Sequence, residues 1–209
     1  MVAAALLCPL AAAPAAAAAR IAAFGDSLSA GYQLPAADSF PAVLERALRH
    51  DGYDVGVDNA AVSGDTTQGG LERLDWSVQD GTTLAIVELG ANDMLRGVDP
   101  AVTARNLDAI VAGLQKRHIG VLLAGMYASV ELDAAYRERF AALYPGLAKR
   151  YGVPLYPFFL AGIIGHPELH LADGLHPNAA GVAVIVASIL PTVEESLKAL
   201  GVQPSGTGK

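Results

Sequence analysis

The stretch Leu84-Ala-Ile-Val-Glu-Leu-Gly-Ala-Asn-Asp93 decides the fold. It opens with a mostly apolar run that is closed by a glycine and then by polar residues. A short apolar run bounded in this way is typical of a strand that is buried on both faces of a parallel sheet. The run Ile21–Phe24 ends in the same way, at Gly25. Two buried strands of this kind point to an α/β fold.

The rest of the chain alternates between strand and helix patterns. Helical spacing of apolar residues predicts helices over 39–50, 102–117, 133–151 and 179–200, the last with Asn178 as its N-cap. Further strands are expected over 53–59, 120–124 and 153–156. Strands that alternate with helices imply a parallel sheet covered on both faces. The sequence therefore predicts one α/β domain, a three-layer α/β/α sandwich.

Composition excludes several classes of function. The chain has 209 residues, of which 53% are hydrophobic and 17% charged, which is typical of a globular protein. Its net charge of -7 argues against a nucleic-acid partner. Because Cys8 is the single cysteine, the chain can have no internal disulfide, and its body offers no cysteine nucleophile and no thiolate metal cluster.

The N-terminal segment resembles a targeting sequence. Residues 2–19 carry no charge and consist mostly of alanine and leucine. We expect residues 1–19 to be a signal peptide cleaved between Ala16 and Arg20, and the protein to be periplasmic or secreted. A buried first helix or a membrane anchor is the alternative, but Pro9 and Pro14 disfavour a stable spanning helix. We expect a globular domain over 20–200, without a membrane span after processing, and a flexible tail over 201–209.

Polar residues follow the predicted strands at the points where these end. They are Asp26-Ser27, Ser63-Gly64-Asp65, Asn92-Asp93 and, before the last helix, the segment Asp173–His176. In parallel α/β sheets, ligands bind beyond the carboxyl ends of the strands. These residues are therefore expected to converge on one site.

Three of these residues would suit nucleophilic catalysis. Asp173 and His176 lie three residues apart, so that a turn of backbone can bring the carboxylate against one imidazole nitrogen. The other nitrogen could then accept the proton of Ser27. Taken alone, Ser27 is more often a helix cap than a nucleophile, and the Asp-x-x-His spacing is a weak signal.

Acyl transfer also needs hydrogen-bond donors where the tetrahedral oxyanion forms. Gly64 could offer its backbone N–H, Asn92 its side-chain amide, and Ser27 its own backbone N–H. Taken singly, Gly64 reads as a turn glycine and Asn92 as a turn or capping residue. Their joint placement at predicted strand ends favours the catalytic interpretation.

Four ordered blocks resemble those of the GDSL (SGNH) hydrolase superfamily. They are Phe24-Gly-Asp-Ser-Leu-Ser-Ala-Gly-Tyr32, Asn59-Ala-Ala-Val-Ser-Gly-Asp-Thr-Thr67, Glu88-Leu-Gly-Ala-Asn-Asp93 and Asp173-Gly-Leu-His-Pro177. Further segments, such as Leu95-Arg-Gly97, look like the bacterial periplasmic thioesterase I, lysophospholipase and arylesterase group. The resemblance implies a flavodoxin-like fold with a five-stranded parallel sheet. It also implies Ser27 as nucleophile, His176 as base, Asp173 as its partner, and Gly64 and Asn92 in the oxyanion hole.

The expected function is a serine esterase that acts on carboxylic ester or thioester bonds. The expected partner is a small-molecule acyl ester, and the protein is expected to be a monomer. No metal or organic cofactor is required; His166-Pro-Glu-Leu-His170 does not fit a zinc-protease helix, because of Pro167 and the position of Glu168. Met94, Leu95 and Tyr127 could receive an acyl chain or be ordinary buried residues. A carbohydrate acetylesterase and a non-catalytic binding module are the alternatives.

Overall fold

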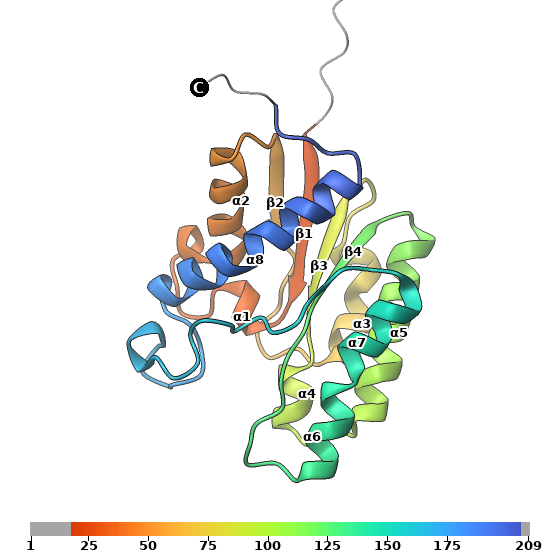
Figure 1. Cartoon of the computed structure of the whole chain (residues 1–209), viewed down its shortest axis with the longest axis vertical. Coiled ribbons are helices and arrows are strands. Elements are labelled where there is room, and N and C mark those ends of the chain that lie inside the picture. The colour runs from red at the N-terminus through yellow and green to blue at the C-terminus, as the bar shows by residue number, and fades with distance from the viewer. Residues whose placement is uncertain (1–17, 206–209) are drawn as a thin grey trace, which may run out of the picture.

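A computed structural model of the chain describes residues 18–205. Five parallel strands form one sheet in the order β2-β1-β3-β4-β5 (Figure 1). The strands are β1 (Ala19–Gly25), β2 (Val55–Asn59), β3 (Leu84–Glu88), β4 (Gly120–Ala124) and β5 (Leu155–Tyr156). This is the flavodoxin-like order, in which the chain reverses its direction of winding between β1 and β3. The predicted fold class is confirmed.

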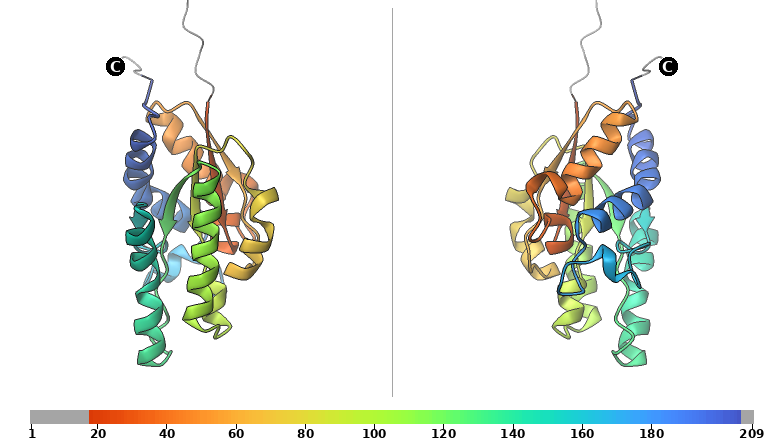
Figure 2. Two further views of the ribbon diagram at one scale, coloured as in Figure 1. Left: turned by 90° about the vertical axis from the view of Figure 1, so that its right-hand side faces the viewer. Right: turned by 90° about the vertical axis from the view of Figure 1, so that its left-hand side faces the viewer.

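Helices cover both faces of the sheet. On one face α2 (Phe40–His50) packs against α8 (Ala179–Ala199), and on the other α3 (Thr67–Ser77) packs against α5 (Pro100–Lys116). Figure 2 shows α8 and α3 on opposite sides of the sheet. Next to α5 lies α7 (Leu143–Tyr151), which also contacts β4 and β5. All five residues of β3 are buried between these layers, as a two-sided parallel sheet requires.

One expected helix is interrupted. In place of a single helix over 133–151, the chain forms α6 (Ala134–Ala141) and α7, with Ala142 between them. The cause is Pro145, which has no N–H to donate and whose ring clashes with the carbonyl of the residue four positions earlier, Ala141. The proline is accommodated in the first turn of a new helix, where its missing donor costs nothing.

Three α-helices were not predicted: α3, α1 (Ser27–Ala30) and α4 (Ala91–Leu95). In α3 the helical pattern is masked by Gly69 and Gly70, which are poor helix formers. Gly70 packs against the Leu89 side chain, which a Cβ atom at this position would have to displace. The glycine thus lets α3 lie close to the residue that follows β3. The two outer strands β2 and β5 begin two residues later than expected, at Val55 and Leu155.

The described residues include all of the expected domain over 20–200 and part of the two segments that flank it. Residues 1–17 of the predicted signal peptide and residues 206–209 lie outside the described residues. The expected tail is attached at least as far as Ser205, whose N–H donates to the Gly52 carbonyl at 2.9 Å. Among the described helices, α8 alone is long and apolar enough to cross a membrane, and one side of it is buried against the protein.

Candidate active site

Ser27 is the first residue of α1, directly after β1. The alternative in which Ser27 caps this helix is wrong, because the carboxylate of Asp26 accepts the N–H of Leu28 at 3.0 Å and serves as the cap. The hydroxyl of Ser27 is therefore available and lies 2.8 Å from His176 Nε2. The strand-to-helix turn thus presents a nearly buried serine at the carboxyl edge of the sheet.

His176 and Asp173 belong to the loop that precedes α8. Asp173 Oδ1 accepts the N–H groups of Leu175 and His176 at 2.9 and 3.0 Å, which folds the loop into a tight turn. Asp173 Oδ2 lies 2.7 Å from His176 Nδ1. The ring of Tyr32 lies against the imidazole, with 4.4 Å between the ring centroids. The structure therefore joins the three predicted residues into one hydrogen-bonded chain.

The charge on Asp173 sets the direction of these hydrogen bonds. The backbone N–H groups of His176 and Leu175, followed by the His176 side chain, lower the pKa of Asp173 to about 2. An ionised carboxylate only accepts, so His176 Nδ1 must donate to it. In a neutral imidazole, Nε2 is then the acceptor that faces the Ser27 hydroxyl. This is the arrangement that lets an imidazole remove a proton from serine.

Asn92 and Gly64, the two other predicted oxyanion donors, lie in different surroundings from each other. Asn92 lies in α4, directly after β3, and its Nδ2 donates to Asp26 Oδ2 at 2.9 Å. Gly64 has a φ of 85°, which favours glycine, and its carbonyl accepts from Arg96 Nη2 at 2.7 Å. Within residues 18–205, the backbone N–H groups of Ser27 and Gly64 donate to no protein acceptor. Asn92 shares a cavity with Ser27, whereas Gly64 does not line that cavity.

Two buried carboxyl groups beneath Ser27 had no predicted role. Asp26 and Glu88 are at most 1% exposed, and Glu88 Oε2 accepts the N–H of Asp26 at 3.3 Å and the hydroxyl of Ser29 at 2.8 Å. Burial raises the pKa of Asp26 to about 6 and that of Glu88 well above its ordinary value. The sequence did contain a signal for Glu88, since it is a charged residue within the otherwise apolar run 84–89, and a buried strand does not require a charge.

A cavity of about 490 Å³ opens from Ser27 and His176. Its walls are mostly apolar and come from α4, from the loop after β4 and from the loop after β5. The predicted Met94, Leu95 and Tyr127 all line it. Tyr127 stacks on Phe158, with 4.6 Å between ring centroids, and forms a flat apolar wall. The cavity joins the serine to a space that suits an apolar chain.

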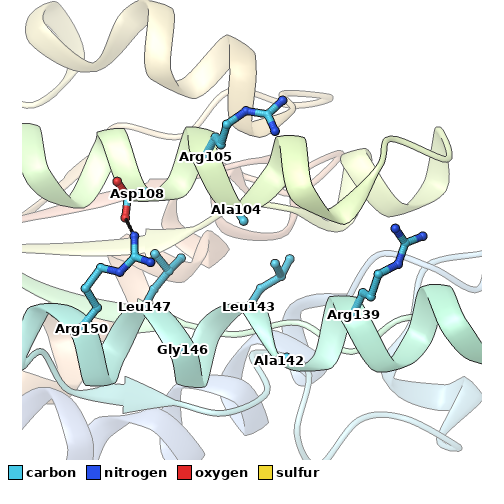
Figure 3. A pocket seen from close by; sticks show the side chains of 9 residues that line it. All are labelled: Ala104, Arg105, Asp108, Arg139, Ala142, Leu143, Gly146, Leu147 and Arg150. Carbon is cyan, nitrogen blue, oxygen red and sulfur yellow. Dashed lines mark hydrogen bonds and ion pairs between the residues drawn. The ribbon is translucent and has the colours of Figure 1, made fainter.

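A second cavity, of about 610 Å³, lies between α5 and the α6–α7 pair (Figure 3). Leu143 and Leu147 line it together with Arg105 and Arg139, and Arg150 is paired with Asp108 across it at 2.5 Å. It contains no serine, cysteine or histidine that could act as a nucleophile or base. Among residues 18–205, no group of three or more His, Cys, Asp or Glu side chains could hold a metal ion.

The fold and the Ser–His–Asp chain define the protein as a serine hydrolase with a flavodoxin-like sheet. Residues 23–184, more than half of the chain, match the model of the GDSL-like Lipase/Acylhydrolase family. The chain belongs to this family and is an ester-hydrolysing serine hydrolase.

Named relatives agree with this assignment. An arylesterase of Vibrio mimicus is 42% identical over 155 residues, which cover 74% of this chain and 78% of the relative. The crystal structure of AlinE4, an SGNH-hydrolase family esterase, is 46% identical, with a TM-score of 0.73 and coverage of 86% of this chain and 97% of that one. The crystal structure of TesA is 35% identical, with a TM-score of 0.79 and coverage of 87% and 99%.

Proposed function

We propose that Ser27 is the nucleophile of a two-step acyl transfer. Its oxygen attacks the carbonyl carbon of an ester or thioester while His176 Nε2 accepts its proton, and the alcohol or thiol leaves with that proton as the acyl-enzyme forms. A water molecule then transfers a proton to the same nitrogen, attacks the acyl-enzyme, and the acid is released. The observation that carries the proposal is the continuous chain from Ser27 Oγ through His176 to Asp173, with links of 2.8 and 2.7 Å.

The oxyanion donors in this proposal are the backbone N–H groups of Ser27 and Gly64 and the side-chain amide of Asn92. The two backbone groups have no protein acceptor within residues 18–205, and a primary amide keeps a second N–H after it donates to Asp26. Donors already held in place at the forming oxyanion are worth more than donors that must reorganise.

The test compares two serines of the same short helix. Ser27→Ala should abolish hydrolysis of nitrophenyl esters and labelling by a fluorophosphonate probe, with a loss of kcat of at least about 10⁴-fold. Ser29→Ala, two residues further on, removes a hydroxyl that bonds Glu88 and should keep kcat within about twofold. A Ser27→Ala protein with near-normal esterase activity would contradict the assignment.

The substrate that we propose has an apolar acyl or aryl group, as in arylesters, acyl thioesters or lysophospholipids. The apolar cavity beside Ser27 supports this class, and the family relatives include an arylesterase and a thioesterase 1/protease 1/lysophospholipase L1. Each methylene that the cavity buries should raise kcat/KM about fourfold, until its length is filled. A carbohydrate acetylesterase would instead prefer the acetate ester and gain nothing from longer chains.

Two aromatic substitutions sharpen this experiment. Tyr127→Ala removes half of the stacked apolar wall and should reduce the preference for long nitrophenyl esters while sparing the acetate ester. Trp76→Ala removes an aromatic side chain that is 67% exposed in α3 and does not line the cavity, so it is the matched control. An unchanged chain-length profile in Tyr127→Ala would contradict the placement of the acyl chain.

We propose further that the mature enzyme is an exported monomer without a membrane span. The uncharged segment over residues 2–19, rich in alanine and leucine, supports export, and cleavage before Ala19 would leave all of β1 intact. The helix α8 fits a core helix, because its buried side packs on α2 and the sheet. Mass spectrometry of the mature N-terminus after secretion, and light scattering of the purified protein, test the two statements separately.

A further inference from the structure

Asp26 is the least exposed charged group of the site, and the acyl-transfer steps do not use it. Its side chain is fully buried between β1 and α4. One carboxylate oxygen accepts the N–H of Leu28, and the other accepts Nδ2 of Asn92 at 2.9 Å. Through its own N–H, Asp26 also touches the buried Glu88 carboxyl group. A single side chain thus links the start of α1 to the side chain of Asn92.

Stability does not explain an aspartate at this position. Serine, threonine or asparagine can cap a helix as well as aspartate does, and none of them brings a charge into the core. Burial disfavours the ionised form of Asp26, and the charge of Asp65 opposes it further. The part of Asp26 that a simple cap could not replace is the second oxygen, which faces Asn92.

We propose that Asp26 is a positioning residue that fixes the side-chain amide of Asn92 for oxyanion binding. The proposal rests on the proposed function, because it requires Asn92 to be an oxyanion donor. The two ends of an asparagine amide have nearly the same shape but opposite hydrogen-bonding character. A carboxylate only accepts, so it selects the nitrogen end of Asn92.

The geometry supports this choice of amide end. The nitrogen of Asn92, and not its oxygen, is turned toward the segment that carries Asp26 and Ser27. If the amide rotated by half a turn, its carbonyl oxygen would face Asp26 and repel both the carboxylate and a developing oxyanion on the same side. Holding a donor in place before the reaction is the source of most oxyanion stabilisation.

A double-mutant cycle between Asp26 and Asn92 tests the proposal. Asp26→Asn keeps the size of the side chain, but an amide nitrogen replaces one of the two carboxylate oxygens, so that either Leu28 or Asn92 loses its acceptor. It should lower kcat about tenfold to hundredfold and change KM by less than about twofold, because the interaction matters in the transition state alone. Asn92→Ala should lower kcat by about 10²–10³. In the Asn92→Ala background, Asp26→Asn should change kcat by less than about twofold.

A second variant separates capping from positioning. Asp26→Ser retains a hydroxyl that can cap α1 but is too short to reach Asn92. It should reproduce the loss of kcat in Asp26→Asn, and it keeps the test decisive if the asparagine variant does not fold. The inhibition constant of a boronic acid, which forms a tetrahedral anion on serine, should rise in parallel with the loss of kcat/KM. Ser29→Ala alters the same buried cluster without touching Asn92 and should leave kcat within about twofold.

The outcomes also distinguish this proposal from the proposed function. If the effects of Asp26→Asn and Asn92→Ala multiply in the double variant, Asp26 does not act through Asn92 and the positioning role is overturned. The same holds if both Asp26 variants keep normal kcat. If Asn92→Ala itself keeps normal kcat, the oxyanion role of Asn92 fails and the positioning role fails with it, whereas loss of activity in Ser27→Ala would still support the nucleophile.

Discussion

Two aspartates flank Ser27 and have opposite chemistry. Asp173 stands on a loop with about a third of its side chain exposed, and hydrogen bonds from the loop backbone and His176 lower its pKa to about 2. Asp26 lies beneath Ser27, fully buried, and its pKa is raised to about 6 although it also accepts two hydrogen bonds. Exposure to water therefore decides the difference between the two pKa values, because hydrogen bonds alone do not compensate for the desolvation of a buried charge.

The comparison separates two tasks that a carboxylate can have in one site. In the proposed mechanism, an ionised Asp173 stabilises the imidazolium that forms on His176 when Ser27 loses its proton. Beneath Ser27, a buried group with two fixed acceptor oxygens holds backbone and side-chain donors in place. The first task requires an ionised carboxylate, and the second requires two acceptor oxygens at fixed positions.

Among the changes that distinguish the two aspartates, the largest effect is expected from removing the charge on Asp173. Asp173→Asn should lower kcat by about 10³–10⁴-fold, because the amide can present its nitrogen to His176 Nδ1 and favour the wrong tautomer. Steady-state kinetics with a nitrophenyl ester measure the loss. Glu168→Gln is the matched control, since Glu168 also bonds a histidine, His166, at 3.0 Å but lies outside the catalytic chain. Equal losses in the two variants would show that charge near the site, and not this contact, is what matters.

The hydrogen-bonded chain of Ser27, His176 and Asp173 could be predicted from the sequence, whereas the contacts of the buried Asp26 could not. Ser27, Asp173 and His176 stand in short blocks whose spacing limits what they can do, and two of them are near neighbours in the chain. The contact between Asp26 and Asn92 joins residues 66 positions apart. Neither the sequence around Asp26 nor the sequence around Asn92 shows that the Asn92 amide donates to Asp26. This hydrogen bond depends on the pairing of β1 with β3.

The predicted elements were correct where the periodicity of apolar residues in the sequence matches the residues that are buried in the structure. The buried strands β3 and β4 and the long helices α5 and α8 have patterns that fit one element type. The errors arose where tertiary packing overrides local preference. In α3 Gly70 lets the helix approach Leu89, and at Pro145 a locally helical pattern is divided in two.

The second expected effect concerns stability rather than rate. The pKa of Asp26 is about 6 in the folded protein and 3.8 as its ordinary value, so the folded state binds more protons between these values. The stability that protonation contributes is therefore complete below about pH 4 and is lost as the pH rises through about 6, with a total of about 3 kcal/mol. Asp26→Asn cannot ionise and should gain stability relative to the wild type over this interval. Urea unfolding from about pH 4 to about pH 7 measures the difference.

Glu88 helps to interpret that measurement. Burial and the charge of Asp26 raise the pKa of Glu88, so Glu88 gives a loss of stability with rising pH in both proteins, and the difference between the two curves reports Asp26 together with its effect on Glu88. Ser29→Ala, which removes a donor from Glu88 and leaves both Asp26 contacts in place, should follow the wild-type slope. Parallel curves for the wild type and Asp26→Asn would mean that Asp26 is not desolvated as its burial indicates.

The smallest expected effect is that of Asp173 on stability. A lowered pKa in the folded state contributes stability above the ordinary value of 3.8, and this contribution is lost as the pH falls toward about 2. Solvent screens this group because its side chain is partly exposed, and asparagine can still accept the N–H groups of Leu175 and His176. Asp173→Asn should therefore change Tm at neutral pH by less than about 2 °C while it removes most activity. A large fall in Tm would show that Asp173 holds the loop before α8 together, and that its charge serves folding as well as His176.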